Sequence, residues 1–470
     1  MKRLLVLAGS LAVAVSSLVA AAGCGGARKP SVVLVIVDSL RADGLGCYGD
    51  KPGASPELDK LCVEGVRFER VVAQAPWNVP SVSSLLTSTY PWKNGRGVGE
   101  VKAGEVTTLA EAMARAGYRT AAFTEVSWPL LQRGFQTFEN TAGSNVFGDP
   151  EASSAAKTFA AALGWIRKGE KQPFFAVIHT YETHSWFLGK PAHHAWAKRE
   201  LPAYQGKFTD WGIRDLASPA GPQVIDALLA AGPEDVAYAR ALYRGAIAEV
   251  DKEVGALAAA LRAAGLDAST VLVITSSNGE GFRPELKRVH HAGRLHDDLL
   301  RVPLVVRWPG HLTPGSASSL VQLLDLAPTV LGLAGAPQEP LFVGRALFAA
   351  DTGLFARFGG PRFALRDLPP LPAVAEDATF ATLPSGQRTS ASAPQLVLYS
   401  DWATLVDAGD HVELYDLKAD PRQEKDVSDK HREVAASLRE QLKRYASEAG
   451  PGSAPDSAQL EQLRSLGYVQ

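Results

Sequence analysis

The sequence predicts an α/β protein with a large mixed, mostly parallel β-sheet flanked by helices, followed by a small C-terminal α+β subdomain. Three continuous apolar runs, at 31–37, 173–180 and 269–275, have the composition of strands that are buried on both faces. Segments with helical periodicity lie between such runs, and the clearest spans 234–264, where apolar residues recur every three or four positions. Alternating strands and helices are typical of βαβ units and therefore of a parallel sheet.

Composition sets limits on size and on partners. The chain has 470 residues and is 46% hydrophobic, which is enough for a large buried core in one big domain with an appendage, or in two domains. Its formal net charge is −2, and no long basic cluster is present. Nothing in this composition argues for nucleic-acid binding.

The N-terminus predicts export. A basic start, Met1-Lys2-Arg3, precedes an apolar stretch that ends in Ala21-Ala22-Gly23-Cys24. This ending resembles the signal of bacterial lipoproteins, so we expect residues 1–23 to be a signal peptide, Cys24 to be lipidated and 24–30 to be a tether. A lipid anchor would hold the protein to a membrane of the bacterial cell envelope without spanning it. An ordinary signal peptide cut elsewhere and an uncleaved anchor are the alternatives.

Two further cysteines, Cys47 and Cys62, follow the tether. An exported protein could pair them in a disulfide, but free buried cysteines are equally compatible with the sequence. No Cys-x-x-Cys pattern of a metal site is present.

Polar residues follow the predicted core strands directly. Asp38 follows the run at 31–37, Ser277 and Asn278 follow the run at 269–275, and His184 follows the run at 173–180. Ligand sites in parallel α/β sheets lie at the carboxyl ends of the strands, so Asp38 is well placed for a site. A helix cap is the simpler interpretation of Asp38, and an exposed loop position is the simpler one of His184.

The stretch 75–87 predicts a helix that starts at a site. Asn78 is a good N-cap residue, and Pro80 is tolerated in a first turn. Unpaired N–H groups and the partial positive charge of a helix N-terminus favour an anion there.

This stretch resembles the sulfatases of the alkaline phosphatase superfamily. Their pattern is Cys or Ser-x-Pro-x-Arg followed by Leu-Leu-Thr-Gly, and here the frame reads Asn78-Val79-Pro80-Ser81-Val82 and then Leu85-Leu86-Thr87. Further segments, such as Leu299-Leu300-Arg301-Val302-Pro303, extend the resemblance over nearly all of 31–470. The resemblance implies an alkaline-phosphatase-like fold, sulfate ester hydrolysis and a divalent cation, calcium or magnesium.

The resemblance also assigns metal ligands. It makes Asp38 and Asn278 ligands, and it places Ser39 and Ser277 where the family commonly has aspartates. Calcium and magnesium prefer anionic oxygen ligands, so only Asp38 is left to attract the ion strongly and we expect weak or no binding.

The resemblance places the nucleophile at Asn78 and its arginine at Val82, and an amide is a poor nucleophile that cannot be oxidised to formylglycine. It also implies a sulfate contact for His184, whereas His179 on the strand is expected to pack in the core. The remaining candidates for anion contacts are His290, His291 and Arg294.

Two hypotheses follow. In the first, the chain is a pseudoenzyme with the sulfatase fold, anchored outside the cell, that binds an anionic or sulfated ligand or a partner protein. In the second, it is an active hydrolase of sulfuric or phosphoric esters with a reorganised site, in which Ser81 or a water is the nucleophile.

The remaining chain suggests a domain plan. We expect a sulfatase-like α/β domain over 31–349, a linker or loop rich in Pro, Ala and Ser over 350–395, and a C-terminal subdomain over 396–470 with a helix near 430–449.

Overall fold

The computed structural model describes residues 29–50, 53–97, 104–143, 154–169, 172–210, 220–291, 294–351, 362–368, 372–377, 395–400, 403–407 and 411–449. The predicted signal peptide, Cys24 and most of the predicted tether and linker lie outside these residues. Among the described helices, none has the length and apolar character needed to cross a membrane.

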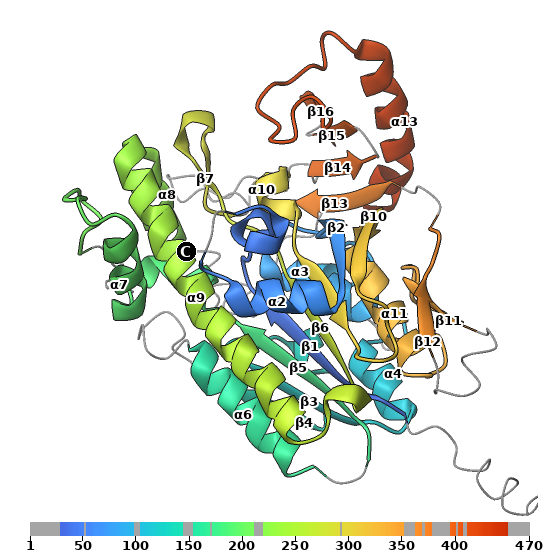
Figure 1. The fold of residues 1–470 in the computed structure, drawn as a ribbon. Helices are drawn as coiled ribbons and strands as arrows, with labels where there is room; N and C mark the ends of the chain where they lie inside the picture. Colours follow the sequence, from blue (N-terminus) through green and yellow to red (C-terminus); the bar gives the residue numbers. More distant parts are fainter. Residues whose placement is uncertain are drawn as a thin grey trace, which may run out of the picture.

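An eight-stranded sheet forms the centre of the molecule, in the order β10-β2-β9-β6-β1-β5-β3-β4 (Figure 1). Its strands are β1 (Ser31–Val37), β2 (Val66–Val72), β3 (Arg119–Thr124), β4 (Thr137–Asn140), β5 (Phe174–Thr180), β6 (Thr270–Ser276), β9 (Leu304–Arg307) and β10 (Gly315–Gln322). β9 runs antiparallel to β2 and β6, and the other neighbours pair in parallel. The predicted mixed, mostly parallel sheet is confirmed.

Helices cover both faces of this sheet. The α-helices are α2 (Pro56–Glu64), α3 (Asn78–Thr87), α4 (Leu109–Arg115), α5 (Pro129–Gln132), α6 (Ala155–Arg167), α7 (Pro191–Glu200), α8 (Ala220–Leu229), α9 (Pro233–Ala263), α10 (Asp297–Leu300), α11 (Leu326–Leu333) and α13 (Arg432–Ala449). Figure 1 shows α2, α6 and α9 in front of the sheet, with α4 and α11 behind it.

The central strand β1 explains why two layers form. Val33, Val35 and Val37 join a core cluster with residues of α2, α6 and α9. The alternate residues, which include Leu34 and Ile36, join a second cluster with α3, α4 and α11. Side chains alternate across a strand, so an uninterrupted apolar run needs cover on both faces.

A smaller antiparallel sheet follows, formed by β13 (Ala373–Asp377), β14 (Gln395–Tyr399), β15 (Ala403–Asp407) and β16 (Val412–Asp416). One of its faces lies under α13, where Leu398 packs with Leu438 and Leu442. The predicted C-terminal α+β unit is therefore present. β13 and β12 (Arg362–Leu365), however, lie within 350–395, where the sequence predicts only a linker or loop.

Three local details differ from, or add to, the sequence predictions. Asn78 is the first residue of α3, and Trp77 takes the N-cap position instead. The segment 190–231, which has no clear pattern, contains α7 and α8. Cys47 and Cys62 form a disulfide, a question that the sequence left open.

Candidate functional site

Four buried polar residues meet at the carboxyl ends of β1 and β6. We call Asp38, Ser39, Ser277 and Asn278 the strand-end cluster; all four are fully buried. The Ser277 hydroxyl hydrogen-bonds to the Asp38 carboxylate and lies 2.8 Å from the Asn278 amide oxygen. The Asn278 amide donates to the Ser39 hydroxyl at 3.3 Å. The structure thus brings the four predicted ligand positions together, and they contact one another.

Burial controls the charge of Asp38. The pKa of Asp38 is raised to about 8. Loss of hydration is the largest cause, and the nearby Glu280 and Glu125 also raise the pKa, whereas the hydrogen bond from Ser277 lowers it. Its Oδ2 atom has no hydrogen-bond partner within the described part of the chain. With these neighbours alone, the carboxyl group is mostly protonated at pH 7.

The first turn of α3 lies against this cluster. The Ser81 hydroxyl donates to the backbone carbonyl of Ser277 at 2.5 Å. The amide oxygen of Asn78 accepts from the N–H of Val79 at 2.7 Å, so this side chain bonds to its own helix. Val82, at the arginine position, is fully buried in the core cluster that contains Ile36. α3 therefore presents neutral groups to the site.

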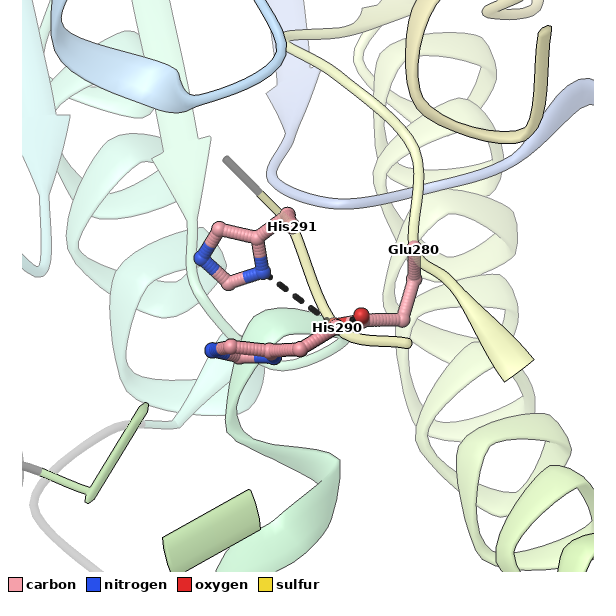
Figure 2. Close-up of side chains that lie close together, drawn as sticks. All are labelled: Glu280, His290 and His291. Carbon is pink, nitrogen blue, oxygen red and sulfur yellow. Dashed lines mark hydrogen bonds and ion pairs between the residues drawn. The ribbon is translucent and has the colours of Figure 1, made fainter. Parts of the chain in front are cut away.

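A second group of polar side chains lies on the next loop. Glu280, His290 and His291, which we call the histidine cluster, are buried together (Figure 2). The Nδ1 atom of His290 is 3.4 Å from Glu280 Oε1, and that of His291 is 3.3 Å from Glu280 Oε2. The His184 ring lies beside them, with its centroid 4.7 Å from that of His291.

A short hairpin produces this juxtaposition. β7 (Phe282–Arg283) pairs with β8 (Arg288–Val289) and returns the chain, so that His290 lies opposite Gly281. Burial lowers the pKa of His291 to about 4, helped by the neighbouring His290. Burial also holds the pKa of His184 well below its usual value, so both rings are neutral at pH 7.

Arg294 is held by a carboxylate. Its guanidinium makes two hydrogen bonds to Asp298, at 2.5 and 2.8 Å, and a third to the His290 carbonyl at 3.2 Å. Asp298 is therefore the partner of Arg294, and it competes with any anion for this guanidinium group.

A cavity of about 740 Å³ opens next to the site. Seven arginines and six carboxylates contribute to its lining: Arg41, Arg240, Arg244, Arg283, Arg288, Arg301, Arg422, Asp43, Asp50, Glu285, Asp297, Asp298 and Glu424. We call it the arginine-lined cavity. Arg41 connects it to the histidine cluster, because its guanidinium donates to the Glu280 carbonyl at 2.6 Å.

Glu280 and Glu125 were not among the residues that sequence reasoning selected. Glu125 is buried directly after β3, where it accepts hydrogen bonds from Thr180 at 2.7 Å and Thr158 at 3.1 Å. The rule that selected Asp38, a polar residue immediately after a core strand, applies equally to Glu125.

The sheet order, the two helical layers and the polar strand ends define an alkaline-phosphatase-like α/β fold. Residues 30–336 match the family model described as Sulfatase, and the chain belongs to the sulfatase family.

Human arylsulfatase A is 27% identical over 360 residues, which cover 67% of this chain and 66% of that protein. The match thus spans about two thirds of the length of this curated relative. The structure of BT4656 in complex with its substrate D-glucosamine-2-N,6-O-disulfate has a TM-score of 0.67 at 19% identity, covering 91% of this chain and 100% of that one. The phosphonate monoester hydrolase of Agrobacterium radiobacter has a TM-score of 0.64 at 21% identity, covering 90% and 96%.

Proposed function

We propose that this chain is a sulfatase-family protein that has lost ester hydrolysis and binds an anionic, sulfated ligand. The observation that carries the proposal is the strand-end cluster. Ser277 hydrogen-bonds to the Asp38 carboxylate and contacts the Asn278 amide oxygen, so three of the inherited ligand positions contact one another, while Asp38 Oδ2 has no hydrogen-bond partner among the described residues.

The donor chemistry of this cluster does not fit the cation of the family. Calcium and magnesium take hard oxygen ligands, and carboxylates supply most of the attraction. Asp38 is the one carboxylate among the five matched positions. The other four, Ser39, Asn78, Ser277 and Asn278, are neutral. We therefore derive no catalytic step through such an ion.

The nucleophile position supports the same proposal. Asn78 offers no group that attacks a sulfate ester, and its amide oxygen already accepts a backbone hydrogen bond. Ser81 is the alternative nucleophile, one turn along α3. It is fully buried, and its proton is directed to a carbonyl oxygen, which is not a general base.

The arginine-lined cavity is the ligand site that we propose. Within the described residues, Arg240 and Arg301 donate to the backbone carbonyls of Phe282 and Glu69 and to no carboxylate. Burial and the nearby Arg41 lower the pKa of Arg240, and an incoming anion would offset both effects. The planar guanidinium group suits the oxygens of a sulfate, and sulfated sugar is the ligand of the neighbour BT4656.

Turnover of aryl sulfate and aryl phosphate esters by the full chain, with calcium or magnesium added, tests the loss of hydrolysis. We expect the wild-type chain to hydrolyse these esters no faster than the Ser81→Ala variant or buffer alone. The site has neither a nucleophile nor the charged group that would activate one. Metal-dependent turnover that disappears in Ser81→Ala would instead establish an active hydrolase with Ser81 as nucleophile.

Calorimetric titration with a sulfated disaccharide and its desulfated counterpart tests the ligand. We expect binding of the sulfated sugar alone, weakened about tenfold in Arg240→Ala, which corresponds to about 1.4 kcal/mol. The control Arg432→Ala removes an exposed arginine of α13 and should bind as the wild type does. Equal affinity for both sugars, or no effect of Arg240→Ala, would contradict the proposed site.

We also propose that the protein is exported and lipid-anchored at Cys24. The Cys47–Cys62 disulfide supports an oxidising compartment. Labelling with a radioactive fatty acid, compared between the wild type and Cys24→Ala, tests the anchor.

A further inference from the structure

The histidine cluster has the ligand types of a transition-metal site. One atom from each of Glu280, His290 and His291 lies within 4.8 Å of the others, and all three side chains are buried. Figure 2 shows the two imidazole rings on the same side of the Glu280 carboxylate. Two histidines and one carboxylate are a common set of protein ligands for zinc, with a fourth position left for water.

The nitrogen–oxygen distances fit a shared ion, and the distance between His291 and Glu280 also fits a hydrogen bond. Protein N–H···O bonds have a mode of about 2.9–3.0 Å between heavy atoms. The two nitrogen–oxygen distances here are 3.4 Å and 3.3 Å. Zinc bonds of about 2.0–2.1 Å would place two ligands of a tetrahedron about 3.3–3.4 Å apart. The Nδ1 atom of His290 is buried and makes no hydrogen bond of acceptable geometry within the described residues.

The surroundings hold these ligands in position. The N–H of Gly281 donates to Glu280 Oε1 at 2.9 Å, and the indole N–H of Trp186 donates to Oε2 at 3.3 Å. Such outer hydrogen bonds orient ligating carboxylates in metal sites. The backbone of His290 adopts φ 57°, a left-handed conformation that is uncommon for residues other than glycine.

We propose that Glu280, His290 and His291 bind a transition-metal ion of the zinc type, in a site separate from the strand-end cluster. Imidazole nitrogens favour zinc, copper, iron and nickel, whereas carboxylate and amide oxygens suit calcium and magnesium. The ligand types of the histidine cluster therefore favour a zinc-type ion, whereas the oxygen ligands of the family's metal position favour calcium or magnesium.

Cobalt(II) is the probe, because a tetrahedral cobalt site absorbs strongly in visible light and the readout needs no enzymatic activity. The full chain, freed of any histidine tag and stripped with chelator, is titrated with cobalt and then with zinc. We expect one equivalent of cobalt to bind with a tetrahedral spectrum and zinc to displace it. Binding should weaken at least tenfold in His290→Ala and in Glu280→Gln, the latter being nearly isosteric and suited to preserve folding.

Two control variants make the result specific. His296→Ala removes another buried histidine that contacts a carboxylate, Glu413, at 3.0 Å, and should leave cobalt binding unchanged. Asp38→Ala should also leave it unchanged, which separates this site from the strand-end cluster. Absence of stoichiometric cobalt binding, or equal binding by the folded Glu280→Gln variant, would overturn the proposal. Neither result depends on hydrolysis or on binding of a sulfated sugar.

Discussion

A single buried carboxyl group decides how the inherited site behaves. Asp38 is fully buried, and its environment favours the protonated form because Ser277 alone does not replace lost hydration. A resident divalent cation would have the opposite effect, since it would stabilise the carboxylate. The pH dependence of stability therefore reports whether a cation is present.

The substitution Asp38→Asn should stabilise the protein at high pH. The pKa is 3.8 in the reference state and about 8 in the folded protein. Between pH 3.8 and about pH 8, the Asp38 carboxyl group is ionised in the unfolded chain but protonated in the folded protein. The resulting contribution to stability is complete below pH 3.8 and lost as pH rises to about 8. The variant should therefore match the wild type near pH 4 and exceed it at pH 8 by on the order of 5 kcal/mol.

Urea unfolding at several pH values measures this difference. The control Asp429→Asn changes a carboxylate that is 95% exposed and should show no pH-dependent gain. Should Asp38→Asn instead lose stability in calcium buffer, Asp38 would be holding a cation and the proposed loss of function would fail.

At the level of elements, sequence patterns predict what local periodicity encodes. The strand β1 matches its predicted range, and β5, β6 and α9 differ from theirs by at most one residue at each end, because each is a long apolar or amphipathic run. The same patterns select Asp38, because sites lie at the carboxyl ends of parallel strands, whereas Ser277 and Asn278 are selected by the family resemblance.

Elements that form only by pairing with distant parts of the chain cannot be predicted from local periodicity. β13 has only five residues within a segment rich in Pro, Ala and Ser, and it becomes a strand by pairing with β14. The contact of Glu280 with His290 and His291 depends on the β7–β8 hairpin, whose two-residue strands carry little periodicity. A tertiary contact that spans 11 residues gives no repeat that a sequence window can detect.

On the scale of the whole molecule, the C-terminal sheet shares the core of the large sheet. Val397 and Tyr399 of β14 belong to the same core cluster as Ile36 of β1. Leu398, on the opposite face, packs under α13. Hydrogen bonds between the units, such as that from the Val374 N–H to Gln322 at 3.0 Å, strengthen the junction. Neither unit buries its apolar surface alone, so we expect the two to unfold together.

Urea unfolding of Val397→Ala and Leu398→Ala tests this expectation. Each variant should unfold in one transition at lower urea, with a loss of about 1–3 kcal/mol for Val397→Ala and about 2–5 kcal/mol for Leu398→Ala. The unfolding curve from tryptophan fluorescence, to which the buried Trp128 and Trp186 of the large unit contribute, should coincide with that from far-UV circular dichroism. The control Val63→Ala, at a position that is 77% exposed, should change stability by less than about 0.5 kcal/mol.

An early transition seen by circular dichroism alone in Leu398→Ala would mean that the C-terminal sheet unfolds by itself. The arginine-lined cavity, which takes Arg422 and Glu424 from that unit, would then lose part of its wall before the large sheet unfolds.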